Sequence, residues 1–79
     1  MITRAEIVDF LVRDGESLVL TRQQCVRLTE VPTAILELLA EPRTRAQLEK
    51  QITAAFGAPP PGRLDEVLSE MAGQGLIRL

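Results

Sequence analysis

The sequence has no histidine, tryptophan or tyrosine, and it has only two phenylalanines and one cysteine among its 79 residues. Without histidine, the commonest general base and the commonest metal ligand are both missing. A single cysteine excludes an internal disulfide and fits a reducing compartment, so we expect a cytoplasmic protein. Because aromatic side chains are so few, the core must be built from leucine, isoleucine, valine and alanine.

Long apolar runs and clusters of like charge are also missing. No stretch approaches the roughly 20 apolar residues of a membrane span, and the first six residues lack the pattern of a signal peptide. Nine basic residues, scattered along the chain, stand against eleven acidic ones, for a net charge of −2. We therefore expect neither a membrane nor a nucleic acid as partner. The length predicts one domain over residues 1–79, with a thin core and little room for a deep cleft.

No arrangement of residues indicates catalysis. Cys25 would need activation to a thiolate, and no neighbour in the sequence supplies it, so we interpret it as a small residue in a strand. Asp65 and Glu66 are adjacent, and adjacent residues on a helix do not face each other. We expect no enzymatic activity, no cofactor and no metal site.

The first third of the chain predicts three strands. Residues 7–13 and 17–21 are rich in β-branched and apolar residues, and the Asp14-Gly15 pair between them is typical of a tight hairpin turn. Residues 25–28 predict a short third strand, in which Val26 and Leu28 share one face.

The remainder predicts three helices. Thr29 is a candidate N-cap for the first helix, and Pro32 lies in its first turn, where a missing N–H costs little. The apolar stripe of this helix, at the spacing of one buried face, is Val31, Ala34, Ile35, Leu38 and Leu39. Glu41-Pro42 ends it.

The second helix begins at about Arg45, because Thr44 and Gln47 form a capping-box pattern. Its stripe is Leu48, Ile52, Ala55 and Phe56, and Gly57 is its expected stop. Residues 58–62, with three prolines, predict a stiff linker. The third helix runs from about Arg63 to Gln74 with the stripe Leu64, Val67, Leu68 and Met71. Gly75 stops it, and residues 76–79 form a terminal extended segment.

This order predicts an α+β fold in which a three-stranded antiparallel N-terminal sheet is followed by three helices. Two helices joined by a short turn, and a third that ends in Gly-Leu-Ile, are typical of a winged helix-turn-helix-like domain. Here the sheet precedes the helices.

The sequence resembles the PqqD-like family, the recognition elements for precursors of ribosomally synthesised and post-translationally modified peptides (RiPPs). The resemblance covers residues 7–79 and depends on a pattern of apolar positions and caps. Its clearest parts are Asp14-Gly15, Leu18-Val19-Leu20, Val26-Arg27-Leu28-Thr29, the Ile35-Leu36-Glu37-Leu38-Leu39 run, Arg43-Thr44 and Gly75-Leu76-Ile77. The chain departs from the family at Thr29, where Asn is frequent, and at the prolines 59–61, which either set the width of a groove or serve only as a linker.

The resemblance implies a stand-alone protein that binds the leader segment of a precursor peptide as an added strand. It would present the leader to a modifying enzyme, such as a radical SAM protein or the leader peptidase and cyclase of a lasso peptide pathway. Carried over by position, the pairing strand is Gln24, Cys25, Val26, Arg27 and Leu28. The groove wall on the third helix comes from Arg63, Leu64, Val67, Glu70, Met71 and Gln74.

Within this site, Arg27 or Arg63 is a candidate partner for an acidic leader residue, and Val67 or Met71 is a candidate floor for an apolar pocket. The alternative interpretation is that the apolar members are plain core and the polar members plain solvated surface. The other flank of the third helix, which carries Asp65, Leu68 and Ala72, is an alternative candidate for the groove wall.

Two other functions stay open. A winged-helix module that binds DNA or regulates through a protein is the first, although three acidic residues on the third helix would repel phosphates. A detached accessory domain of an enzyme is the second. The oligomeric state is open because a second copy of the chain is able to pair with an unpaired edge strand.

Overall fold

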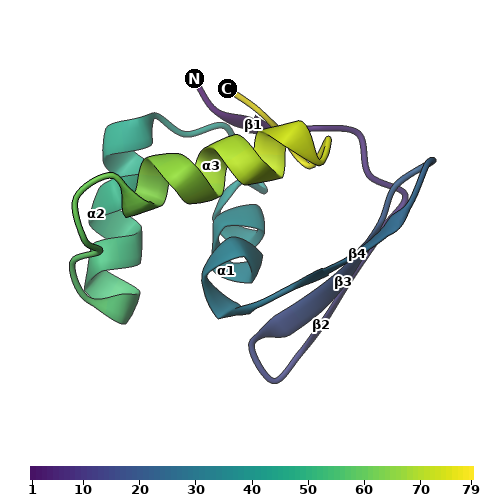
Figure 1. The fold of residues 1–79 in the computed structure, drawn as a ribbon, viewed down its shortest axis with the longest axis horizontal. Coiled ribbons are helices and arrows are strands. Elements are labelled where there is room, and N and C mark those ends of the chain that lie inside the picture. The colour runs from purple at the N-terminus through teal and green to yellow at the C-terminus, as the bar shows by residue number, and fades with distance from the viewer.

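The computed structural model describes residues 1–79 and has an α+β architecture (Figure 1). Its elements, in chain order, are β1 (Thr3–Arg4), β2 (Asp9–Arg13), β3 (Glu16–Leu20), β4 (Cys25–Leu28), α1 (Glu30–Leu38), α2 (Arg45–Phe56), α3 (Arg63–Gly73) and β5 (Ile77–Arg78). A small antiparallel sheet followed by three helices is therefore confirmed.

The main sheet has three antiparallel strands in the order β2-β3-β4. Its β2–β3 hairpin closes through Asp14 and Gly15, whose φ values of 54° and 79° are those of the tight turn that the sequence predicts. In β3 and β4 the side chains alternate between buried and exposed, with Val19, Val26 and Leu28 on the buried inner face. β2 begins at Asp9 and not at residue 7. Leu20 is the residue opposite Asp9, but its carbonyl accepts a bond from the Val8 N–H, so the regular ladder does not continue beyond Asp9.

The first helix is the centre of the molecule. Figure 1 shows α1 between the three-stranded sheet and α2, with α3 crossing above it. Its buried side chains are Thr33, Ile35 and Leu36, and the C-cap Leu39 is also buried, so the helix is covered on two sides. The predicted one-sided stripe was partly wrong, because Val31, Ala34 and Leu38 are only half-buried while Leu36 is fully buried.

One apolar core joins the sheet, the helices and the chain ends. Its buried members are Ile2, Val19, Val26, Leu28, Ile35, Leu36, Leu39, Leu48, Ile52, Leu64, Val67, Leu68, Met71, Leu76 and Ile77. Beside it, the hydroxyls of Ser17 and Thr33 bond at 2.8 Å, so two buried polar groups satisfy each other.

The two ends of the chain pair with each other. β1 and β5 form a separate antiparallel ribbon, in which Thr3 opposes Arg78 and Arg4 opposes Ile77. The Arg4 Nε donates to the Leu36 carbonyl at 2.7 Å, which attaches this ribbon to α1. The terminal extended segment was predicted, but the two-residue strand β1 was not, because so short a strand has no alternating pattern.

The helix boundaries follow the predicted caps with one exception. The capping box is present, since the Gln47 N–H donates to the Thr44 hydroxyl at 3.1 Å and the Thr44 N–H to Gln47 Oε1 at 2.9 Å. Thr29 is at the N-cap of α1, but its side chain makes no capping bond. The stripe of α3 is buried as predicted, and Gly57 and Gly75 follow α2 and α3 with positive φ.

The last turn of α2 departs from its predicted stripe. Leu48 and Ile52 are buried, whereas Ala55 is exposed and 44% of Phe56 is exposed. This turn extends past the core, so its apolar side chains meet solvent. No helix of the structure has the length and apolar character needed to cross a bilayer.

Candidate functional site

The strand β4 is an edge of the main sheet, and its backbone polar groups can be assigned to its two sides. In an antiparallel ladder, opposed residues alternate between pairs that exchange both backbone bonds and pairs that exchange none. The Thr21 N–H donates to the Gln24 carbonyl at 2.9 Å, and the register continues with Val19 opposite Val26. The alternation therefore turns the backbone N–H and C=O of Cys25 and Arg27 outward, away from β3.

The start of β4 lies near the end of α3, and the residue that follows β4 lies near the start of α3. At one end, the Gln24 Nε2 donates to the Gln74 carbonyl at 3.2 Å. At the other end, Thr29, directly after β4, and Arg63, the first residue of α3, line the same cavity. The four residues of β4 span about 13 Å and the eleven residues of α3 about 16 Å.

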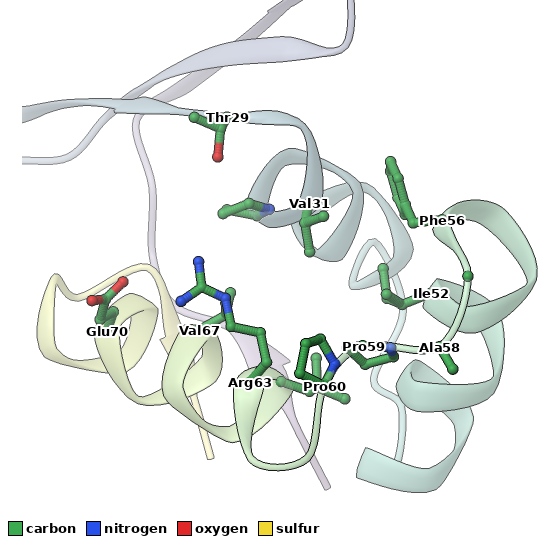
Figure 2. Close-up of a pocket in the computed structure, with 13 residues that line it drawn as sticks. Thr29, Val31, Ile52, Phe56, Ala58, Pro59, Pro60, Arg63, Val67 and Glu70 are labelled. Atoms are coloured by element: carbon green, nitrogen blue, oxygen red, sulfur yellow. The ribbon is translucent and has the colours of Figure 1, made fainter.

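The cavity has a volume of about 390 Å³ and lies where α1, α2, α3 and the proline linker meet (Figure 2). Its lining comprises Thr29, Val31, Pro32, Ile52, Phe56, Gly57, Ala58, Pro59, Pro60, Arg63, Leu64, Val67 and Glu70. The volume is within the range of sites that bind small molecules or single side chains. The last turn of α2 and the prolines thus form a wall of this cavity.

Two charged side chains of opposite sign stand among these apolar residues. Figure 2 shows Arg63 reaching from α3 toward the start of α1, while Glu70 lies two turns farther along α3. Arg63 also contacts Glu66 at 3.4 Å, an exposed pair one turn apart. Such a pair contributes little to stability, so the guanidinium is free to reorient toward a ligand.

The structure brings only part of the predicted site together. Arg63, Leu64, Val67 and Glu70 share the cavity, and Gln24 and Gln74 meet at the far end of β4. Met71 is 1% exposed and does not line the cavity, so its side chain belongs to the core. Val26 and Leu28 are also core side chains.

The side chains of Cys25 and Arg27 lie on the opposite, outer face of the sheet. Cys25 opposes the exposed Leu20, and Arg27 opposes the exposed Leu18. Arg27 also pairs with Glu16 at 3.3 Å. These two residues therefore offer backbone groups to the open edge of β4, but their side chains point away from the cavity.

Sequence reasoning missed the half of the cavity that α1, α2 and the linker supply. Phe56 and Ile52 were assigned to one buried stripe, and the prolines were expected either to set the width of a groove or to serve only as a linker, and not to line the site. A phenylalanine at the very end of a helix, just before a glycine and a proline run, was the available signal, because no further helical turn is there to cover it.

An exposed ion pair links α3 to α2. The Arg45 Nε contacts Asp65 Oδ1 at 2.7 Å, and the Arg45 Nη1 contacts Glu49 Oε2 at 2.6 Å. The hydrogen bond from Arg45 holds the pKa of Asp65 below its usual value, and the bonds to Asp65 and Glu49 raise the pKa of Arg45. The flank of α3 that carries Asp65 therefore faces α2, and the flank with Arg63 and Glu70 faces the cavity.

This pair predicts a small acid-dependent term in stability. Because the pKa of Asp65 is lowered by folding, its contribution is fully present above its unfolded value of about 4 and is lost as the pH falls through the lowered value. We expect Asp65→Asn to flatten the acid limb of the free energy of unfolding, measured in urea between about pH 2 and 6. The exposed Glu66→Gln serves as control, and parallel curves for Asp65→Asn and the unmodified chain would contradict this assignment.

The arrangement offers surfaces suited to binding. No group of three or more cysteine, aspartate and glutamate residues is placed to hold a metal ion. What the site combines is an open strand edge, a link from its start to the end of α3, and an apolar cavity with an arginine beyond its other end. Comparisons of the chain with family models, curated proteins and solved structures found no match.

Proposed function

We propose that this chain binds the leader segment of a ribosomally made precursor peptide by strand addition and presents the peptide to a modifying enzyme. The observation that carries the proposal is the open edge of β4, whose start is bonded through Gln24 to the end of α3 and whose end leads to Thr29 at the cavity. An edge with free N–H and C=O groups supplies affinity for any extended backbone, and pockets beside it supply selectivity. The resemblance of the sequence to the PqqD-like family favours the same function.

The dimensions of the site define the ligand. The edge of β4, about 13 Å long, accommodates about four residues of an extended peptide. Alternate side chains of that peptide would point toward the helices, and the residue that passes Thr29 would meet the cavity. Its apolar wall with Arg63 suits an apolar anchor beside an acidic residue, whose carboxylate would bond to the guanidinium.

A winged-helix arrangement is part of the proposal, but DNA is the less favoured partner. The exposed face of α3 carries Asp65, Glu66 and Glu70, and a shallow hollow on it is lined by these three with Gly62 and Ser69. In a winged helix this face would enter the major groove. Its carboxylates would repel the phosphate backbone, so we expect no salt-sensitive mobility shift of duplex DNA even at low ionic strength.

A binding measurement tests the peptide function. The probe is a fluorescently labelled peptide with the leader sequence of a precursor encoded next to this chain, and the readout is fluorescence polarisation. Arg63→Glu reverses the only basic charge of the cavity, so we expect the affinity to fall at least about tenfold, as when one partner of a charge-assisted bond is lost.

The matched control is Arg78→Glu, which makes the same charge change at an exposed position of β5. It should leave the affinity within twofold of the unmodified chain, a margin of about 0.4 kcal/mol. Equal affinity for Arg63→Glu and the unmodified chain would remove the cavity from the site. No binding of the leader by the unmodified chain, together with a salt-sensitive DNA shift, would overturn the function itself.

A further inference from the structure

The strand β2 is the second edge of the main sheet, and no other element pairs with its outer side. It reads Asp-Phe-Leu-Val-Arg, and all of its residues except Phe10 are exposed, with Leu11 at 61%. Natural proteins usually protect such an edge with proline, lysine or a covering loop. β2 has none of these, and its middle is apolar, so it is an open pairing surface.

The turn fixes which backbone groups of β2 face outward. In a two-residue hairpin the residues that flank the turn, here Arg13 and Glu16, exchange backbone bonds. Alternation then directs the backbone of Leu11 and Asp9 toward β3 and that of Phe10 and Val12 toward the open side. The Phe10 N–H donates to Oδ1 of the preceding residue, Asp9, at 2.8 Å, as expected for a donor without a strand partner.

We propose that two copies of the chain pair through β2 in antiparallel fashion, with a two-fold axis at Leu11. In this register Phe10 of one copy exchanges backbone bonds with Val12 of the other. Asp9 then lies directly opposite Arg13 of the second copy, twice, and Leu11 lies opposite its own equivalent. The strand is therefore self-complementary in charge, in apolar contact and in hydrogen bonding, which is what a closed two-fold interface requires.

Other features favour a second copy as the occupant. Arg13 makes no ion pair within the chain, so it is free to meet Asp9 of the partner copy. On the outer face Leu11 is directly opposite the exposed Leu18, so pairing through Leu11 joins two exposed leucine pairs into one apolar stripe.

The other edge lacks this symmetry. Antiparallel pairing of β4 with itself about Val26 would set Cys25 opposite Arg27, with no opposite charges. The dimer through β2 has the six-stranded order β4-β3-β2-β2-β3-β4. Both β4 edges then stay open at the outer ends of the sheet.

Charge reversal provides the first test, with the molar mass from light scattering at micromolar to millimolar concentrations as the readout. The unmodified chain should approach twice its mass of 8.7 kDa as concentration rises. Asp9→Arg alone and Arg13→Asp alone each set like charges opposite each other, so each should stay a single chain. The double variant Asp9→Arg/Arg13→Asp and an equimolar mixture of the two single variants should both recover the dimer.

Disulfide trapping provides the second test, in a Cys25→Ser background. In the proposed register the Cα atoms of the two Leu11 residues are about 4.5 Å apart, within reach of a disulfide. The two Leu18 residues are three strand spacings apart, about 14 Å, and cannot be bridged. Leu11→Cys should therefore form a covalent dimer under mild oxidation, and the matched control Leu18→Cys should not.

Three results would each overturn the proposal. These are a single-chain mass for the unmodified protein at every concentration, no recovery of the dimer when the two charge-reversed variants are mixed, and equal trapping of Leu11→Cys and Leu18→Cys. Circular dichroism detects a variant that fails to fold. In that case Asp9→Lys and Arg13→Glu, which make the same charge reversals at the same two positions, replace the first pair of variants.

Discussion

Substituting proline for Arg27 should lower the affinity for the leader peptide about fivefold or more while the fold is kept. Arg27 turns its backbone N–H toward the open edge of β4, so proline removes a donor that the bound peptide needs and leaves the β3–β4 bonds in place. An unpaired carbonyl on the bound peptide costs about 1–3 kcal/mol, which corresponds to roughly five- to 160-fold in affinity. Fluorescence polarisation with the labelled leader measures the change.

Two further variants distinguish the contribution of the Arg27 backbone from that of its side chain, and the edge at β4 from the edge at β2. Arg27→Ala removes the same guanidinium and its exposed pair with Glu16, but it keeps the N–H, so the affinity should hardly change. Val12→Pro removes an outward N–H from the opposite edge. It should leave leader binding intact and abolish the dimer through β2. Equal losses of leader affinity for Arg27→Pro and Val12→Pro would show that the peptide is not held at β4.

Truncating Leu36 to alanine should have the largest effect on stability. Leu36 is fully buried in α1, and deletion of a leucine side chain from a core costs about 2–5 kcal/mol. A domain of 79 residues has a total stability on the order of 4–12 kcal/mol, so the loss is a large fraction of it. The midpoint of thermal unfolding should fall by about 10 °C or more, as measured by circular dichroism.

The matched control is Leu38→Ala, two residues along the same helix. Leu38 is only half-buried, so its truncation should cost clearly less than that of Leu36. Periodicity in the sequence ranks the two residues the other way, with Leu38 in the buried stripe and Leu36 outside it. Greater destabilisation by Leu38→Ala would therefore contradict the packing of α1 described above.

The helix α1 shows why the sequence predicted the elements better than the packing. A hydrophobic stripe identifies one buried face, and this works for α3, which is covered on one side. α1 contacts the sheet on one side and α2 on the other, so its buried residues surround most of the axis and no single stripe describes them. Turns and caps were predictable because they depend on local geometry, as at Asp14-Gly15 and Thr44.

The candidate site was predictable only where it lies on one element. The flank of α3 that carries Arg63, Val67 and Glu70 follows from helical spacing. The opposite wall depends on how far α2 extends past the core and on where the linker returns the chain, and neither is visible in local pattern. The outward direction of the Arg27 side chain also required the strand register, because a shift by one residue reverses every side chain in a strand.

The ribbon of β1 and β5 places the first and last residues of the chain next to each other. Domains with adjacent ends tolerate circular permutation and insertion into a surface loop of another protein. A short Gly-Ser connection would therefore join the two ends, and the chain can be reopened at the exposed Asp14-Gly15 turn. Such a permutant would have its new ends at the tip of the hairpin, next to Glu30 at the start of α1, so an enzyme fused there would lie beside the end of the peptide edge.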